Sequence, residues 1–279
     1  MRVPFHISVN TIRRLKQVQT LLDQLDPEAA PQALIVPGSP VPRGGIIVFP
    51  GSFNPPTTAH LALLKQARQF ASLHTSMQVY AAVSKLITDK ENVERPLLLD
   101  RILLLDTVLR RHLPGTGILL FNRGLYVEQA EAVRTSFPQV TRLLFLVGFD
   151  KIVQILDPHY YNDRDAALKE LFALAELLVA PRGDAGPEAL HELLSRPENR
   201  PFAQHISTLP FSNAYRDISS TQIRQHPGAH RGDILPEVRR FMSETRAYAS
   251  PVRLSNEIDY YGERVKILEA LLKNAKVGR

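Results

Sequence analysis

The fold is indicated most clearly by the stretch Ile46-Ile47-Val48-Phe49-Pro50-Gly51-Ser52-Phe53-Asn54-Pro55-Pro56-Thr57-Thr58-Ala59-His60. Its first four residues form a short apolar run, which is typical of a strand that is covered on both faces. Apolar residues then recur at three- and four-residue steps over residues 60–72, which predicts a helix. A buried strand, a tight Gly-Ser turn and a helix in direct succession indicate an α/β protein.

The same alternation continues outward from this stretch as far as residue 224. Further apolar runs with the length of strands are Gln78–Val83, Gly117–Phe121, Arg142–Val147, Leu177–Ala180 and His205–Thr208. Helical patterns cover Pro96–His112, Val127–Thr135, Phe149–Leu156 and Asp165–Leu174. This order predicts an α/β fold with a doubly wound parallel sheet of five to six strands and helices on both faces. Ligands bind such sheets beyond the carboxyl ends of the strands, where the strand order reverses.

The two ends of the chain follow other patterns. Residues 12–25 have helical periodicity, and the prolines that follow, up to Pro42, predict a linker without a helix or an inner strand. Helical patterns at Leu235–Arg246 and Glu257–Ala275 predict additional C-terminal helices. We therefore expect three parts, which are an N-terminal helix with a Pro-rich linker (1–43), a central α/β domain (44–225) and a C-terminal helical segment (226–279).

Composition limits the classes of protein and partner. With 44% hydrophobic and 22% charged residues, the 279-residue chain has an ordinary globular composition. Its 34 Lys and Arg against 28 Asp and Glu give a charge of +6, which suits an anionic partner. Basic residues occur as pairs such as Arg13-Arg14 and not as runs, so a nucleic acid is not expected as the partner.

The absence of cysteine excludes disulfides, thiolate nucleophiles and cysteine-bound zinc. It fits a reducing compartment, and we expect the cytoplasm, with the nucleus as an alternative. Apolar stretches fall well short of the roughly 20 residues that span a membrane. The first ten residues also lack the apolar centre of a signal peptide, so no membrane partner is expected.

The turn after the first strand has the properties of an anion site. Gly51 and Ser52 permit a tight turn with exposed backbone N–H groups, which attract anions at the start of a helix. His60, in the first helical turn, can direct an imidazole toward the same space. The alternative is a plain loop with a helix cap at Thr57 or Thr58, and an incidental surface His60. Neither a Walker A motif nor a three-glycine dinucleotide turn is present.

A second motif comes after the last strand, at Ile218-Ser219-Ser220-Thr221-Gln222-Ile223-Arg224. Its hydroxyl residues can cap a short helix, and Arg224 lies on the same helical face as Thr221. A guanidinium beside a helix start suits phosphate. An ordinary capped helix with a solvated arginine is the alternative.

Together the two motifs resemble the signatures of the nucleotidyltransferase superfamily, specifically the nicotinamide/nicotinate mononucleotide adenylyltransferases. The first corresponds to Gly51-Ser52-Phe53-Asn54-Pro55-x-Thr57-x-x-His60-Leu61, where many members have a second His in place of Thr57. The form with Thr57 is similar to the eukaryotic-type nicotinamide mononucleotide enzymes. The second motif is the family's segment for the ATP phosphates. The resemblance covers about residues 45–225 and implies a Rossmann-like nucleotidyltransferase domain there.

The resemblance also implies a reaction and a set of site residues. The reaction is AMP transfer from ATP to nicotinamide or nicotinate mononucleotide, with Mg²⁺ carried on the ATP phosphates. The implied catalytic residues are His60, Arg224, Thr57 and Lys90. The implied ATP-binding residues are Gly51, Ser52, Phe53, His60, Gly148, Asp150, Ser219, Ser220, Thr221 and Arg224. The implied mononucleotide-binding residues are Ser52, Lys90 and Arg101, with Lys90 preferred to Lys85.

Other interpretations stay open at several positions. Asp150 can serve only the dipole of its own helix. The resemblance implies that Arg182, after the run Leu178–Ala180, faces the nucleotide, but Arg182 and Lys90 can also be solvated charges. Asp100 and Arg101 can form a surface ion pair. For the whole chain the alternatives are the same fold with another phosphorylated acceptor, or a nucleotide-binding regulatory protein without catalysis. The C-terminal helices can complete the domain, cover the site or form a homo-oligomer interface.

Overall fold

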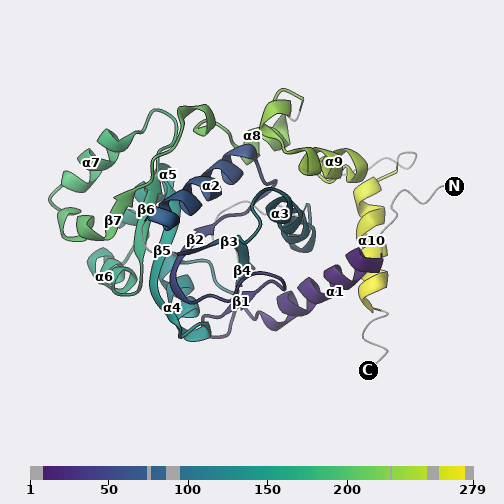
Figure 1. Cartoon of the computed structure of the whole chain (residues 1–279), viewed down its shortest axis with the longest axis horizontal. Coiled ribbons are helices and arrows are strands. Elements are labelled where there is room, and N and C mark those ends of the chain that lie inside the picture. The colour runs from purple at the N-terminus through teal and green to yellow at the C-terminus, as the bar shows by residue number, and fades with distance from the viewer. Residues whose placement is uncertain (1–8, 74–76, 86–94, 227, 250–257, 274–279) are drawn as a thin grey trace.

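A seven-stranded sheet between two layers of helices forms the centre of the molecule (Figure 1). The computed structural model describes residues 9–73, 77–85, 95–226, 228–249 and 258–273. The strand order is β1-β4-β3-β2-β5-β6-β7, with β1 antiparallel to β4 and every other pair parallel. Without β1, this is the order of the doubly wound dinucleotide-binding fold, and it reverses between β2 and β5. The predicted fold class is confirmed.

The strands are short, as their apolar runs predict. They are β1 (Ala33–Ile35), β2 (Gly44–Pro50), β3 (Gln78–Ser84), β4 (Gly117–Phe121), β5 (Val140–Gly148), β6 (Glu176–Ala180) and β7 (Ile206–Thr208). The helices before the second motif are α1 (Val9–Gln24), α2 (Thr58–Leu73), α3 (Leu98–His112), α4 (Tyr126–Ser136), α5 (Phe149–Leu156), α6 (Arg164–Leu174) and α7 (Pro187–Ser195). The later helices are α8 (Ser220–Gln225), α9 (Pro236–Thr245) and α10 (Tyr260–Lys273). Single 3-10 turns occupy Pro158–Tyr160, Arg200–His205, Asn213–Tyr215 and Arg231–Asp233.

Two elements were not predicted. The seventh strand, β1, lies inside the Pro-rich segment, where prolines flank a three-residue strand at the edge of the sheet. Edge strands tolerate nearby proline because one side of the strand makes no ladder hydrogen bonds. The helix α7 begins with Pro187 in its first turn, where the missing N–H has no intrahelical role.

The two faces of β2 belong to two separate hydrophobic clusters. Ile47 and Phe49 pack into the cluster formed with α1, α2, α3 and the C-terminal helices. Ile46 and Val48 pack into the cluster formed with α4, α5, α6 and α7. The central strand is therefore buried on both sides, which explains its continuous apolar sequence.

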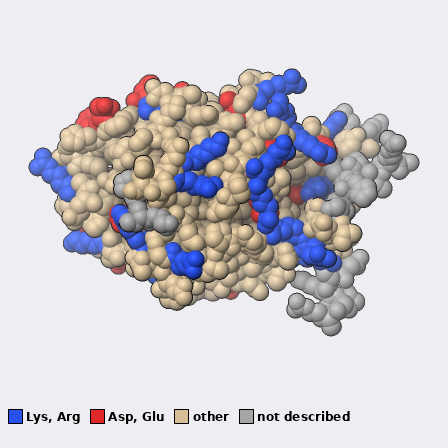
Figure 2. Space-filling view, viewed as in Figure 1, with Lys and Arg blue, Asp and Glu red and all other residues tan. Residues whose placement is uncertain are grey.

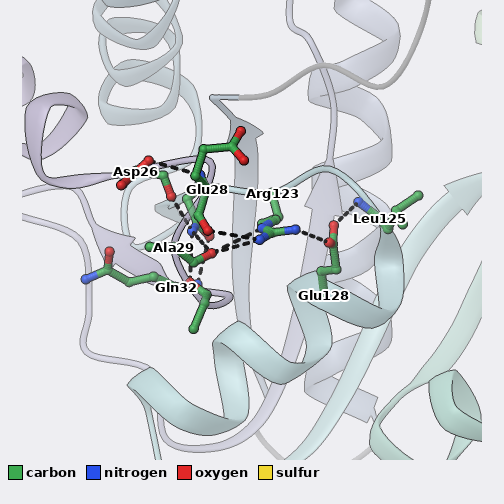
Figure 3. Close-up of polar contacts among 9 residues, drawn as sticks. Asp26, Glu28, Ala29, Gln32, Arg123, Leu125 and Glu128 are labelled. Carbon is green, nitrogen blue, oxygen red and sulfur yellow. Dashed lines mark hydrogen bonds and ion pairs between the residues drawn. The ribbon is translucent and has the colours of Figure 1, made fainter.

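The N-terminal extension is packed onto this sheet. The helix α1 lies against α3, where Arg14 forms an ion pair of 2.7 Å with Asp106. The segment that follows α1 is held by Arg123, at the end of β4 (Figure 3). Arg123 donates to the carbonyl of Ala29 at 3.0 Å and pairs with Glu128 of α4 at 3.0 Å. The division of the chain into three parts stays a prediction, with its first part in contact with the second.

The C-terminal helices are attached to α3. The carboxylate of Asp100 on α3 accepts two hydrogen bonds from Arg264, at 2.6 and 3.1 Å, and one from the hydroxyl of Tyr261, at 2.8 Å. Leu268 of α10 is buried in the same cluster as α3. Within the described ranges, no helix combines the length and apolarity that crossing a membrane requires.

The Asp100–Arg264 pair yields a stability prediction. Asp100→Asn should lower the free energy of unfolding by about 3 kcal/mol, because it leaves the mostly buried Arg264 without its counter-charge. Urea denaturation of the full chain measures this change. The control is Lys266→Gln, which breaks an exposed pair on the same helix and should leave the urea midpoint unchanged. Equal midpoints for both variants would contradict the prediction.

Candidate active site

The candidate site lies where the strand order reverses. The loop 51–57 leaves the carboxyl end of β2, and Gly148 ends the neighbouring strand β5. Beside this point is a cavity of about 490 Å³. Gly51, Ser52 and Arg101 line it on one side, and side chains of α4, α5 and α6 line the other. The position agrees with the ligand site of doubly wound sheets.

The backbone of the first loop differs from expectation at Gly51. The Gly51 N–H donates to the carbonyl of Ala82 at 2.9 Å and so extends the sheet ladder. This N–H is therefore not an open donor for phosphate, and that part of the prediction is wrong. Space is tight at Gly51, since a Cβ would lie 3.1 Å from the ring of Phe53. Phe53 has a φ of 44° and a fully buried ring, and it turns the loop toward α2.

Thr57 and His60 form a reciprocal cap at the start of α2. The His60 N–H donates to Thr57 Oγ1 at 3.3 Å, and the Thr57 N–H donates to His60 Nδ1 at 3.0 Å. This is the geometry of a capping box, with histidine in place of the usual Glu or Gln. The predicted cap at Thr57 is present, and the same bonds fix the orientation of the His60 ring.

These contacts determine which nitrogen of His60 carries the proton. A backbone N–H can only donate, so Nδ1 must be an acceptor and the neutral ring has its proton on Nε2. Burial of the ring, with the positive charge of Arg182 as a second cause, lowers the pKa of His60 to about 4. The ring also packs against Phe49 and Phe53, with centroids 5.9 and 5.0 Å away. His60 is thus a neutral hydrogen-bond donor at neutral pH.

The second motif is joined directly to the first. Arg224 Nη1 donates to the carbonyl of Asn54 at 2.6 Å, and Ser220 Oγ donates to the carbonyl of Pro55 at 2.9 Å. Arg224 also donates to Thr221 Oγ1 at 3.2 Å. The interpretation of Arg224 as a solvated arginine is therefore wrong. Ser219 precedes α8 as its N-cap residue, without a side-chain cap bond.

Arg101 is buried and not part of a surface pair. Its side chain lies at the cavity, yet only 5% of the residue is exposed. The neighbouring Asp100 is bound by Arg264 and Tyr261 instead. Burial is the main cause that lowers the pKa of Arg101, and Arg224 adds to the effect. A buried guanidinium at a cavity is well suited to an anionic ligand.

The remaining predicted residues have varied placements. Asp150 pairs with Arg182 at 3.0 Å on the exposed side of the switch point. Lys85 donates to the carbonyls of Leu22 and Leu25 at the end of α1. Lys90 lies outside the described residues.

Several cavity residues were missed by the sequence analysis. They are Tyr126, Gln129, Lys151, Tyr160 and Tyr161, together with aliphatic residues of α5 and α6. Their positions follow from how α4, α5 and α6 pack on the sheet, and no local motif marks them. Among the described residues, no three His, Cys, Asp or Glu side chains lie together as a metal site.

Basic side chains are spread in several groups over the face shown in Figure 2, and acidic ones are most evident toward its upper left edge. The groups are separated by uncharged surface. The charge of +6 is thus not gathered into one band on this face.

A curated protein of Schizosaccharomyces pombe is similar in sequence. It is named "Putative nicotinamide mononucleotide adenylyltransferase" and is 25% identical over 139 residues. The chain resembles a mononucleotide adenylyltransferase. The alignment covers 49% of this chain and 53% of the relative, so the chain spans about half the length of the curated relative that it matches. This similarity confirms the resemblance that the two motifs predict.

The other comparisons are weaker. The crystal structure of a "Putative Nicotinate-nucleotide Adenylyltransferase" from Vibrio parahaemolyticus matches 74% of this chain and 95% of its own, with 14% identity and a TM-score of 0.41. No family profile matches the chain.

The environment of His60 yields a titration prediction. Arg182→Gln should raise the pKa of His60 above about 4, because it removes a positive charge that disfavours the imidazolium. Histidine-resolved NMR titration measures this value. Lys169→Gln, which removes an exposed charge on α6, is the control and should have no effect.

The lowered pKa of His60 also predicts how the stability of the fold changes with pH. The unfolded chain takes up the His60 proton near pH 6.5, whereas the folded protein takes it up near pH 4. The contribution of His60 to stability is thus complete above pH about 6.5 and falls as the pH decreases toward 4. A His60 pKa near 6.5 in the folded wild type would contradict both statements.

Proposed function

We propose that the chain is a nucleotidyltransferase that transfers AMP from ATP to nicotinamide or nicotinate mononucleotide and releases pyrophosphate. The main support is the pair of hydrogen bonds that joins Arg224 and Ser220 to the loop before His60. Two motifs that are far apart in the sequence thereby meet at the loop that follows β2. The start of the same loop, at Gly51 and Ser52, lines the cavity. The name of the S. pombe relative supports the same reaction.

The reaction requires positioning and charge stabilisation more than a base. The mononucleotide phosphate is already an anion at neutral pH, so it can attack the α-phosphorus of ATP directly. The new P–O bond forms as the bond to pyrophosphate breaks, and negative charge builds on the α-phosphate oxygens. His60 Nε2–H, held by Thr57, would donate to one of these oxygens.

Arg224 of the second motif and basic residues outside the motifs would hold the phosphates. Arg224, beside the first loop, would contact the β- and γ-phosphates. Thr221 accepts a hydrogen bond from Arg224, and Ser220 ties α8 to the Pro55 carbonyl of the first loop. Arg101 and Ser52 line the cavity, in which the mononucleotide would bind with its ring among tyrosines. Lys90 keeps its proposed contact with the mononucleotide phosphate. Gly148 and Asp150 would lie toward the adenosine.

Mg²⁺ would enter with ATP. It would neutralise charge on the phosphate chain, and such ions usually keep several waters and bind through phosphates. A cytoplasmic location and a homo-oligomer stay predictions.

Pyrophosphate release tests the reaction itself. Purified full-length chain with ATP and Mg²⁺ should release pyrophosphate only when nicotinamide or nicotinate mononucleotide is added. A coupled phosphate assay measures the rate, and chromatography identifies the dinucleotide. If pyrophosphate is released only with a different phosphorylated acceptor, that compound is the acceptor in place of the mononucleotides. If the chain binds ATP but releases no pyrophosphate with any acceptor, a regulatory protein is favoured.

His60 provides the sharper test of mechanism. His60→Ala should lower kcat about 100- to 1,000-fold, because it removes a donor that acts on the transition state. The matched control is His191→Ala on the exposed side of α7, which should retain wild-type turnover. Thermal unfolding of both variants shows that they are folded. Near-normal turnover of folded His60→Ala would refute the assigned role.

A further inference from the structure

Three hydrogen-bond donors belong to segments whose helices α3, α8 and α9 share one buried hydrophobic cluster beside the candidate site. Arg101 comes from α3, Arg224 from α8, and Tyr248 from the residues that follow α9. The helix α9 packs along α3, which brings Tyr248 toward Arg101. Both guanidiniums are near enough to affect the ionisation of the Tyr248 hydroxyl. The C-terminal segment thus contributes to a cluster with Arg101 of α3 and Arg224 of the second motif.

The cluster has donors without matching acceptors. Within the described ranges, the buried Tyr248 hydroxyl and the buried Nε of Arg101 have no hydrogen-bond partner. A buried polar group without a partner is costly, and in native proteins it commonly marks a place for water or an ion. Burial raises the pKa of Tyr248, so its hydroxyl keeps the proton and can donate.

No carboxylate neutralises Arg101 within the part of the chain that the structure describes. The nearest one in sequence, Asp100, accepts two hydrogen bonds from Arg264 and one from Tyr261. Arg264 therefore compensates the charge of Asp100, and Arg101 keeps its positive charge for another partner. The charge of Asp100 also reaches the Tyr248 hydroxyl, but Arg264 compensates it. Donors with an additional positive charge suit an oxyanion.

We propose that Arg101, Arg224 and Tyr248 form a subsite for a phosphate group of the ATP phosphate chain, with Tyr248 as a further binding residue. The assignment to ATP rests on the proposed function, because Arg224 belongs to the motif that meets the first loop. The C-terminal segment then completes the substrate site in addition to covering α3. The phosphate of the mononucleotide could occupy the same subsite, and the experiment below distinguishes it from the ATP phosphates.

The test is Tyr248→Phe in the full chain, with pyrophosphate as the probe. Calorimetry with Mg²⁺ should give a pyrophosphate Kd about 10-fold or more above wild type, since a hydrogen bond to a charged group is lost. Binding of nicotinamide mononucleotide should be unchanged. The urea midpoint of the free protein should not fall, because the removed hydroxyl has no partner there. Tyr260→Phe, which keeps its ring against Arg246, is the matched control.

Each outcome decides a separate point. Wild-type pyrophosphate affinity in Tyr248→Phe would overturn the proposal, and weaker mononucleotide binding alone would move the subsite to the acceptor. If Tyr248→Phe does not fold, Arg101→Gln serves instead, with the same expected loss of pyrophosphate affinity and the same contrary result. Mononucleotide binding is no readout for this variant, because Arg101 also lines the cavity proposed for the mononucleotide. A loss of pyrophosphate affinity in a chain that never forms a dinucleotide would support the subsite and reject the adenylyl transfer. If the wild type forms a dinucleotide but Tyr248→Phe keeps its pyrophosphate affinity, the adenylyl transfer is supported and the subsite is rejected.

Discussion

The burial of β2 on both faces is the constraint on which the rest of the structure depends. A strand with apolar residues on both sides needs a layer of helices on each side. Helices α2 and α3 cover one face and α4 to α7 the other, so the chain must change sides once. That change occurs between β2 and β5 and leaves their carboxyl ends open together. The cavity beside this opening is a consequence of the change.

The local sequence predicted those features whose causes are local. Six strands and most helices were identified because apolar periodicity reflects which face is buried. The cap at Thr57 was also predictable, since a threonine before a helical pattern satisfies the first free N–H groups. The three-residue edge strand β1 was missed, because its pairing with β4 involves residues far away in sequence.

The site was predicted less completely for the same reason. The Gly51 N–H is bound to the Ala82 carbonyl because the hydrogen-bond ladder with β3 continues to this residue. The sequence of the turn does not reveal where that ladder ends. The true partner of Asp100 is Arg264, far along the chain, although Arg101 is adjacent in sequence. Tyr248 belongs to no motif, and its position follows only from the docking of α9 on α3. Motifs therefore indicated the centre of the site, while tertiary packing determined its edges.

The capping of α2 also has chemical consequences. In most helices the cap only satisfies backbone groups, but here one of the capping acceptors is the imidazole of His60. The helix start and the tautomer of the ring are thus fixed by the same pair of hydrogen bonds. A mutation at Thr57 would act on stability and on chemistry together.

The contact of Arg123 with the segment after α1 extends this coupling to the N-terminal extension. Arg123 binds the carbonyls of Glu28 and Ala29 and also Glu128, whose other oxygen caps α4 at Leu125 (Figure 3). Leu125 and its neighbours line the cavity. The N-terminal extension, which carries no motif, is therefore connected through Arg123 and Glu128 to the wall of the cavity.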